Sequence, residues 1–350
     1  MKRSLIATGI AGMLISMDAL AQTRVGFIYV GPRTDFGYNY AQDQGRQYLE
    51  ANMEDVTTLY FENIPENAEV RRVMERMINS GVDIIFPTSY GYLDPALALA
   101  PRFPDTTFVH SGGLQTAANL STYFAEIDQA MYLAGVTAGL VTETANLGFI
   151  AAHPIPQVLR NINAFTRGAR SVNPDVETSV IWTASWSNPS AESEAANTLI
   201  DNGADVLVGH VDSPINYTQT AERRGVYAVG YHADASEFAP NGWLVSAEWN
   251  WGPMMVDIVS SIKDGSWQPE HLRGDLTTNA ARLGAFGQAV PEEAQATVLE
   301  VQEQIMAGEY SIWYGPVKAQ DGSVLFESHM EMEDIESMGF LVEGVRGRLP

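Results

Sequence analysis

The 350-residue chain contains no cysteine and few basic side chains. The lack of cysteine excludes disulfides, thiolate nucleophiles, zinc–thiolate sites, iron–sulfur clusters and an N-terminal lipidated cysteine. Lys and Arg number 20 against 43 Asp and Glu, which gives a formal net charge of −23. Nucleic acids and anionic membranes bind positively charged protein surfaces, so we expect neither as a partner. The 45% apolar and 18% charged residues are typical of a packed globular protein.

Residues 1–21 have the three-part pattern of a secretory signal peptide. Lys2 and Arg3 supply a positive start, Ser4 to Met17 is almost wholly apolar or small, and Ala19-Leu20-Ala21 resembles a cleavage site. The apolar stretch is too short to span a membrane; a buried N-terminal helix is the alternative. We therefore expect cleavage after Ala21 and export to the periplasm.

The remaining chain contains the same arrangement of elements twice. The strand expected at 24–30 has its counterpart at 146–151, where Gly148 lies 122 residues after Gly26. The same offset separates Gly81 from Gly203, each of which ends a helical stretch before an apolar strand. The β-rich runs 57–61 and 179–183 occupy matching places. This period is too long for a solenoid and indicates two copies of one α/β lobe.

Alternating strands and helices predict parallel sheets with right-handed crossovers. We place an N-terminal lobe at 22–144 and about 245–290, a C-terminal lobe at 145–244 and about 291–330, and a C-terminal tail at 331–350. We expect helices at 40–52, 68–80, 158–171, 191–202, 251–263 and 292–307, and a late strand at 323–327.

Aromatic and small polar residues follow nearly every expected strand. Ligands of open parallel sheets bind beyond the carboxyl ends of the strands, and two facing lobes would form a cleft there. Such residues suit a flat, uncharged, hydrogen-bonding ligand stacked between rings, although a sugar would also accept aromatic platforms. An anionic ligand would need a basic partner, for which Arg33 and Arg160 are the nearby candidates. The candidate contacts are Tyr38, Tyr90, Trp186, Asp212, Asp234 and Trp251.

An exported hydrolase is the alternative from another functional class. His153, His210, His232, Asp212 and Asp234 all follow strands of one lobe and could bind a metal or act as a base. The sequence contains no H-E-x-x-H, G-x-S-x-G or P-loop pattern. We therefore expect no catalytic residue, metal or cofactor, and we expect Trp182, within its strand, to belong to the core.

Ten short motifs occur in order between residues 24 and 320. They are Asp35-Phe-Gly-Tyr-Asn39, Glu62-Asn-Ile-Pro-Glu66, Ser89-Tyr-Gly-Tyr92, Tyr132-Leu-Ala-Gly135, Pro154-Ile-Pro156, Asn163-Ala-Phe165, Trp186-Ser-Asn-Pro189, Asp201-Asn-Gly-Ala-Asp205, Gly230-Tyr-His-Ala-Asp234 and Trp249-Asn-Trp-Gly252. With them the chain resembles the basic-membrane-protein (BMP) family of ABC-transporter substrate-binding proteins, the purine nucleoside receptor group. The resemblance implies the type I periplasmic-binding-protein fold, with two Rossmann-like lobes joined by a hinge. It also implies a purine base or nucleoside as ligand, inner-membrane permease subunits as partners, and a monomer.

The resemblance also implies roles for single residues. The family's ring-stacking and base-reading positions fall on Tyr38 and Asn39, its second stacking position falls on Trp186, and an aspartate falls on Asp234. Nucleoside-binding members are often glycine-rich where this chain has Gly209-His-Val-Asp212. This departure favours a free base such as adenine over a nucleoside; sugar, amino acid and riboflavin remain alternative ligands.

Overall fold

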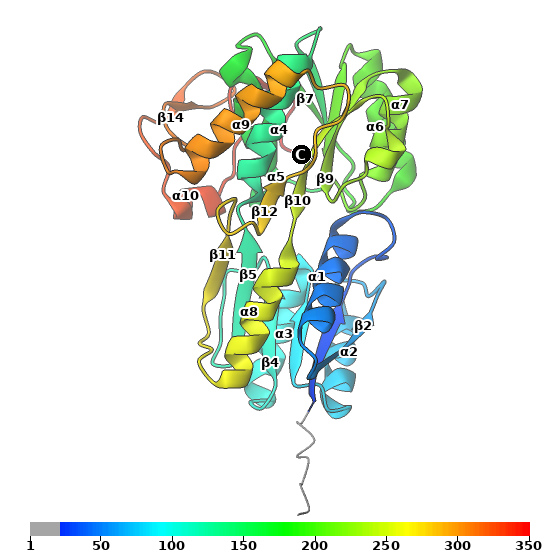
Figure 1. Ribbon diagram of the computed structural model, residues 1–350, viewed down its shortest axis with the longest axis vertical. Helices are drawn as coiled ribbons and strands as arrows, with labels where there is room; N and C mark the ends of the chain where they lie inside the picture. Colours follow the sequence, from blue (N-terminus) through cyan, green and yellow to red (C-terminus); the bar gives the residue numbers. More distant parts are fainter. Residues whose placement is uncertain (1–21) are drawn as a thin grey trace, which may run out of the picture.

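A computed structural model of the chain describes residues 22–350, so the expected signal peptide lies outside the described residues. Within the described part, no helix is long and apolar enough to cross a membrane. Two lobes lie one above the other along the long axis of the molecule, each built on a sheet with helices packed against it (Figure 1).

The N-terminal lobe is built on a six-stranded sheet in the order β11-β5-β4-β3-β1-β2. All of its strand pairs are parallel. Its strands are β1 (Thr23–Ile28), β2 (Val56–Phe61), β3 (Ile84–Pro87), β4 (Thr107–Ser111), β5 (Leu120–Ala125) and β11 (His271–Gly274). Its helices are α1 (Tyr38–Asn52), α2 (Ala68–Asn79), α3 (Leu93–Leu99) and α8 (Trp251–Asp264), with 3₁₀ turns at Tyr90–Tyr92 and Ala100–Arg102.

The C-terminal lobe is built on a seven-stranded sheet in the order β12-β10-β9-β8-β6-β7-β15. Its strands are β6 (Asn146–Ala151), β7 (Glu177–Trp182), β8 (Val206–His210), β9 (Tyr227–His232), β10 (Trp243–Trp249), β12 (Ala281–Leu283) and β15 (Val345–Arg346). Its helices are α4 (Ile127–Val141), α5 (Pro156–Val172), α6 (Pro189–Asp201), α7 (Ile215–Arg224), α9 (Glu292–Met306) and α10 (Met332–Glu336), with a 3₁₀ turn at Ser236–Phe238. A small hairpin of β13 (Val317–Lys318) and β14 (Val324–Phe326) lies outside both sheets.

The two sheets repeat one topology, as the sequence predicted. The order β2-β1-β3-β4-β5 in one lobe corresponds to β7-β6-β8-β9-β10 in the other. Gly26 in β1 pairs with Ile85, the second residue of β3, and Gly148 in β6 pairs with Leu207, the second residue of β8. Gly81 and Gly203 follow α2 and α6 with φ of 83° and 97°, a left-handed conformation that glycine adopts without a steric penalty.

The chain crosses between the lobes at three places. β5 leads into α4, which packs on α5 and β10 of the other lobe; β10 leads into α8, which packs on α1; and β11 leads back to β12 (Figure 1). The sequence had placed these crossings near residues 144, 245 and 290, whereas the structure has them next to Glu126, at Asn250 and between Gly274 and Ala281. The first difference arises because α4 is buried in the C-terminal lobe along nearly its whole length.

The C-terminal residues also differ from the expected separate tail. β15 pairs with β7 in parallel, so this end of the chain completes one edge of the C-terminal sheet. α10 packs on α5 of the same lobe. Residues 331–350 are therefore part of the C-terminal lobe.

Candidate functional site

A narrow cavity lies between the lobes, beyond the carboxyl ends of their strands. Its volume is about 60 Å³, and we call it the slot. Its walls are Val30, Tyr38, Ser89, Tyr90, Ser111, Phe124, Ile155, Gln157, Trp186, His210, Val211, Asp212 and His232. Four of the predicted contacts, Tyr38, Tyr90, Trp186 and Asp212, are therefore brought together here.

Rings from both lobes line the slot. Tyr38, the first residue of α1, is held by a hydrogen bond of 2.8 Å between its hydroxyl and Ser111 Oγ. Its ring lies edge-on to that of His232, 5.7 Å between centroids. From the other lobe, Trp186 packs edge-on against His153 at 5.0 Å. Tyr38 and Trp186 thus offer aromatic surface to the slot from opposite lobes.

One buried carboxyl, Asp212, lies in the slot without a cationic partner. Only 5% of its surface is exposed, and no ion pair within residues 22–350 includes it. Burial raises the pKa of the Asp212 carboxyl well above its usual value, and Asp35 and Glu192 raise it further, while the Asn39 amide lowers it. Burial therefore works against ionisation of this carboxyl, and a protonated carboxyl can both donate and accept a hydrogen bond.

Asn39 stands directly behind this carboxyl rather than in the slot. Its Nδ2 donates to both carboxylate oxygens of Asp212 at 3.0 Å, and the residue is fully buried. The structure thus gives Asn39 a hydrogen bond that orients Asp212, where the family resemblance implied a contact with the base.

Two histidines of the slot are neutral. His232 Nδ1 accepts a hydrogen bond of 2.9 Å from Trp249 Nε1, and its Nε2 lies 2.9 Å from the Val211 carbonyl oxygen, so the proton is on Nε2. Burial lowers the pKa of His232 to about 3 and the pKa of His210 well below its usual value. Neither ring supplies a positive charge to the slot at neutral pH.

Direct hydrogen bonds join the lobes beside the slot. Tyr38 N–H donates to the Asp212 carbonyl at 3.0 Å, and Ser213 Oγ donates to the Asp35 carbonyl at 2.7 Å. Gln157 Nε2 donates to the Gly112 carbonyl at 3.2 Å. Together with the Asn39–Asp212 bonds, these contacts hold the lobes closed over the slot.

A larger chamber of about 340 Å³ adjoins the slot, with which it shares Tyr90, Phe124, Ile155 and Gln157. Its charged lining residues are Asp94, Glu126, Arg160, Arg273 and Glu336. Arg273 pairs with Glu336, 2.7 Å from nitrogen to oxygen. Burial raises the pKa of Glu126 to about 7, with Asp128 adding to the rise.

Two predicted contacts, Asp234 and Trp251, lie outside the slot. Asp234 is exposed and accepts a hydrogen bond from Ser236 N–H at 2.9 Å. Trp251 is 1% exposed and stacks on Trp249 with 4.6 Å between centroids. Both border a separate groove beside the β10–α8 crossing. Asp234 misses the slot because the chain turns at His232, whose φ is 77°.

Phe124 and Gln157 line the slot and were missed from the sequence. Phe124 is in β5, one residue before the strand ends, so the aromatic strand-end pattern that marked the other rings also applies to it. Gln157 is the second residue of α5, immediately after the Pro154-Ile-Pro156 motif. Trp182, which was expected in the core, is half-buried at the end of β7 and donates to the Arg348 carbonyl at 2.9 Å.

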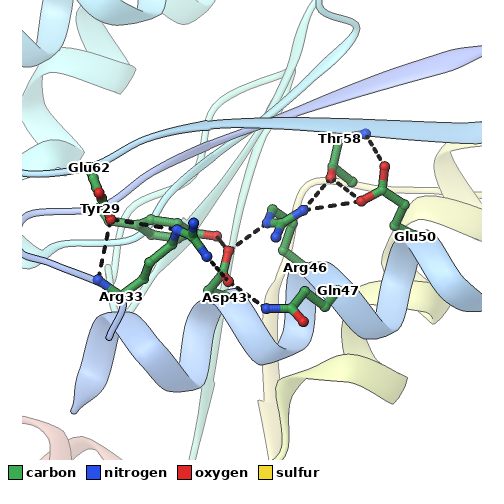
Figure 2. Close-up of polar contacts among 8 residues, drawn as sticks. All are labelled: Tyr29, Arg33, Asp43, Arg46, Gln47, Glu50, Thr58 and Glu62. Atoms are coloured by element: carbon green, nitrogen blue, oxygen red, sulfur yellow. Dashed lines mark hydrogen bonds and ion pairs between the residues drawn. The ribbon is translucent and has the colours of Figure 1, made fainter. Parts of the chain in front are cut away.

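Arg33, one of two candidate partners for an anionic ligand, is already engaged within the N-terminal lobe. Figure 2 shows Asp43 between Arg33 and Arg46, with nitrogen–oxygen distances of 3.2 and 2.6 Å. The guanidinium of Arg33 also lies 4.4 Å above the ring of Tyr60 and near Glu62. These contacts tie α1 to β1 and β2.

Of the histidines and carboxylates considered for a metal site, His210, His232 and Asp212 line the slot. Across the part of the chain that the structure describes, no group of three or more His, Cys, Asp or Glu side chains could hold a metal ion.

Comparison with known proteins now assigns the family. A family model described as ABC transporter substrate-binding protein PnrA-like, of the Bmp family, matches residues 22–315. The chain belongs to this family. Bmp proteins of this kind are substrate-binding components of ABC transporters, which implies a ligand and permease partners.

Two relatives match nearly the whole chain. A purine-binding protein of Brucella abortus is 37% identical and covers 99% of both chains. A putative ABC transporter glucose-binding protein of Haloferax volcanii is 36% identical and covers 93% of this chain and 80% of its own. Their names differ in the ligand they give.

Solved structures confirm the fold. A solute-binding protein of an ABC transporter system from Aeropyrum pernix K1 superposes with a TM-score of 0.74 at 16% identity, covering 90% of this chain and 96% of its own. A second one, from Conexibacter woesei, gives a TM-score of 0.70 at 21% identity, covering 83% and 98%. The expected periplasmic-binding-protein fold is therefore confirmed.

Proposed function

We propose that this protein is the periplasmic binding component of a purine importer and holds a free purine base, with adenine favoured, without altering it. The slot carries this proposal: rings from both lobes surround one buried carboxyl that has no cationic partner. The purine-binding relative in Brucella abortus supports the same ligand class.

We infer that Asp212 favours adenine over guanine when the N7 edge of the base faces it. In its protonated form the carboxyl offers one donor and one acceptor side by side. Adenine presents the complementary pair, the N7 acceptor beside the N6 amino donor, whereas guanine presents two acceptors, N7 and O6, at the same edge. Stacking of the ring on Tyr38 and Trp186 would add roughly 1–3 kcal/mol for each aromatic side chain.

Glucose, the ligand in the name of the Haloferax volcanii relative, is the alternative that must be tested. Buried hydroxyl groups need hydrogen-bond partners. The slot has few free ones, because Ser111 already bonds Tyr38, Ser89 Oγ bonds Glu66 at 2.6 Å, and Gln157 bonds the Gly112 carbonyl. This shortage favours a flat heterocycle.

Calorimetric titration of the exported form, stripped of bound ligand, tests the proposal. Adenine, guanine, hypoxanthine, adenosine, guanosine, glucose and riboflavin form the panel. We expect micromolar or tighter binding of adenine, which lies within the limit of about 1.5 kcal/mol per heavy atom for small ligands. No heat with any purine would contradict the proposal, and binding of glucose alone would replace it.

Asp212→Asn tests the role of the carboxyl. The amide keeps the size of the side chain, but only its oxygen can accept the bond from Asn39 Nδ2, so its donor and acceptor are fixed in one orientation, whereas a protonated carboxyl can carry its proton on either oxygen. We expect adenine affinity to fall at least tenfold and the preference over guanine to shrink. An unchanged preference would show that another group reads the base edge.

A further inference from the structure

Arg160 lies in the chamber beside the slot and forms no ion pair within residues 22–350, although the Glu126 carboxyl lines the same chamber. It lies on α5, only 6% of its surface is exposed, and it lines the chamber. Its Nε has no hydrogen-bond partner, and no ion pair within residues 22–350 includes it. A buried charge without a partner is costly, because desolvation removes its interaction with water and nothing replaces it. The arginine is therefore set for a group that is not part of the chain.

The other arginines near the site are already neutralised. Arg33 is paired with Asp43, as Figure 2 shows, and Arg273 is paired with Glu336 across the chamber. In a chain with 43 acidic and 20 basic side chains, acidic partners are plentiful. Arg167, on the same helix, also has no ion pair, but it donates to the Ile312 and Tyr314 carbonyls. Within residues 22–350, Arg160 has neither an ion pair nor a hydrogen bond, which distinguishes it from arginines that only support the fold.

The first turn of α5 adds to the positive potential. The helix begins at Pro156 next to the chamber, has no side-chain cap and has no acidic residue in its first turn. The helix dipole favours an anion at this end, and the Gln157 N–H has no partner within residues 22–350, whereas Pro156 has no N–H and the Val158 N–H donates to the Ile155 carbonyl. Arg160 lies one turn further along the same helix.

We propose that the chamber is an anion subsite, in which Arg160 and the first turn of α5 hold a phosphate group attached to the purine whose ring occupies the slot. The proposal rests on the proposed function, because the slot must hold the ring. The chamber adjoins the slot through Tyr90, Phe124, Ile155 and Gln157, so one ligand can occupy both. The protein would thus bind a purine nucleoside monophosphate in addition to the free base.

Glu126 separates this proposal from a subsite for uncharged sugar hydroxyls. Its carboxyl lines the same chamber and is close enough to Arg160 and Arg273 for both to act on its ionisation. Hydroxyl groups would bind both side chains, so loss of either would weaken a nucleoside. An anion is attracted by Arg160 but repelled by ionised Glu126. Removal of the charge of Arg160 should therefore weaken binding of an anionic ligand, and removal of the charge of Glu126 should strengthen it.

The experiment is calorimetric titration at pH 8 and low ionic strength with adenine, adenosine, AMP, and adenine in the presence of inorganic phosphate. Wild type is compared with Arg160→Met and Glu126→Gln, and Arg223→Met removes a charge from the exposed end of α7 as the matched control. We expect AMP to bind at least tenfold more tightly than adenosine in wild type. Arg160→Met abolishes this gain, Glu126→Gln enlarges it three- to tenfold, and Arg223→Met leaves it unchanged.

The possible outcomes are distinct. If inorganic phosphate strengthens adenine binding in wild type but not in Arg160→Met, the same subsite is supported, with an unattached anion as its occupant. Equal affinities for adenosine and AMP in wild type, with no effect of phosphate, overturn the subsite even if Arg160→Met does not fold. A parallel loss in Arg160→Met and Glu126→Gln overturns it in favour of hydroxyl recognition. Absence of any purine binding refutes the proposed function instead.

Discussion

Closure of the lobes depends on a glycine at their contact. Gly37 precedes α1 with extended backbone angles, φ −97° and ψ −157°, so alanine fits the backbone. A Cβ at this position, however, would lie 1.6 Å from the Asp212 carbonyl oxygen and 3.1 Å from the Ser213 Cα of the other lobe. Gly37→Ala would therefore leave each lobe folded and prevent their contact.

The magnitude follows from the hydrogen bonds at the contact. The lobes must separate by about 2 Å to bring the new methyl group to van der Waals distance. This breaks the bonds of Tyr38 N–H and Asn39 Nδ2 to Asp212, at 3.0 Å, and that of Ser213 Oγ to Asp35, at 2.7 Å. At about 1 kcal/mol net for each, closure loses roughly 3 kcal/mol, and affinity falls by about a hundredfold.

Calorimetry with adenine and small-angle scattering with and without it form the assay. Gly37→Ala should bind about a hundredfold more weakly and lose the ligand-dependent compaction, with its thermal stability almost unchanged. Gly339→Ala is the matched control, because its Cβ meets nothing closer than 3.9 Å. Wild-type affinity and wild-type compaction in Gly37→Ala would refute the argument that these contacts belong to the ligand-bound state.

Three further substitutions test the site and the fold. Trp186→Ala should weaken adenine binding at least tenfold in calorimetry, since it removes a ring from the slot, whereas Trp182→Ala, outside the slot, should not; equal effects would argue against stacking. Burial raises the pKa of Asp35 to about 6 in the folded protein. Protonation of Asp35 therefore stabilises the folded state, and the free energy of unfolding should fall as the pH rises from about 4 to 6. Asp35→Asn should flatten this dependence by about 2 kcal/mol in denaturant titrations, and identical pH profiles would contradict the assignment. Gly135→Ala places a Cβ 2.0 Å from the Phe165 carbonyl oxygen, so α4 and α5 must separate and the melting temperature should fall by several degrees; an unchanged value would show that the helices yield without cost.

The duplicated fold was predictable because its signals are local. A glycine must follow α2 and α6 where the chain takes a positive φ, so Gly81 and Gly203 mark the same point in both lobes. Asn188, next to Pro189 at the start of α6, caps this helix: its side chain accepts a hydrogen bond from Ala191 N–H at 3.1 Å. Such features depend on neighbouring residues and are visible in the sequence.

The crossings between lobes depend on distant contacts and were placed less well. α4 is apolar on most of its surface, which indicates burial but does not indicate which lobe provides it. Tertiary packing on α5 and β10 decides the question. The same holds for β15, whose two residues join the sheet only through pairing with β7.

The site was predictable to the level of strand ends and no further. Tyr38, Trp186 and Asp212 follow strands and reach the slot, as the sheet geometry requires. Asp234 also follows a strand but is turned away, and Trp251 packs back on Tyr123 at 5.3 Å. Side-chain direction after a strand depends on local backbone turns and on packing partners far away in the sequence.

A crystal structure of the protein grown with adenine tests the role of the slot. We expect one planar ligand between Tyr38 and Trp186, with its amino edge within hydrogen-bond distance of the Asp212 carboxyl. Adenine bound instead in the groove beside Trp251, or lobes closed on an empty slot at saturating adenine, would contradict it.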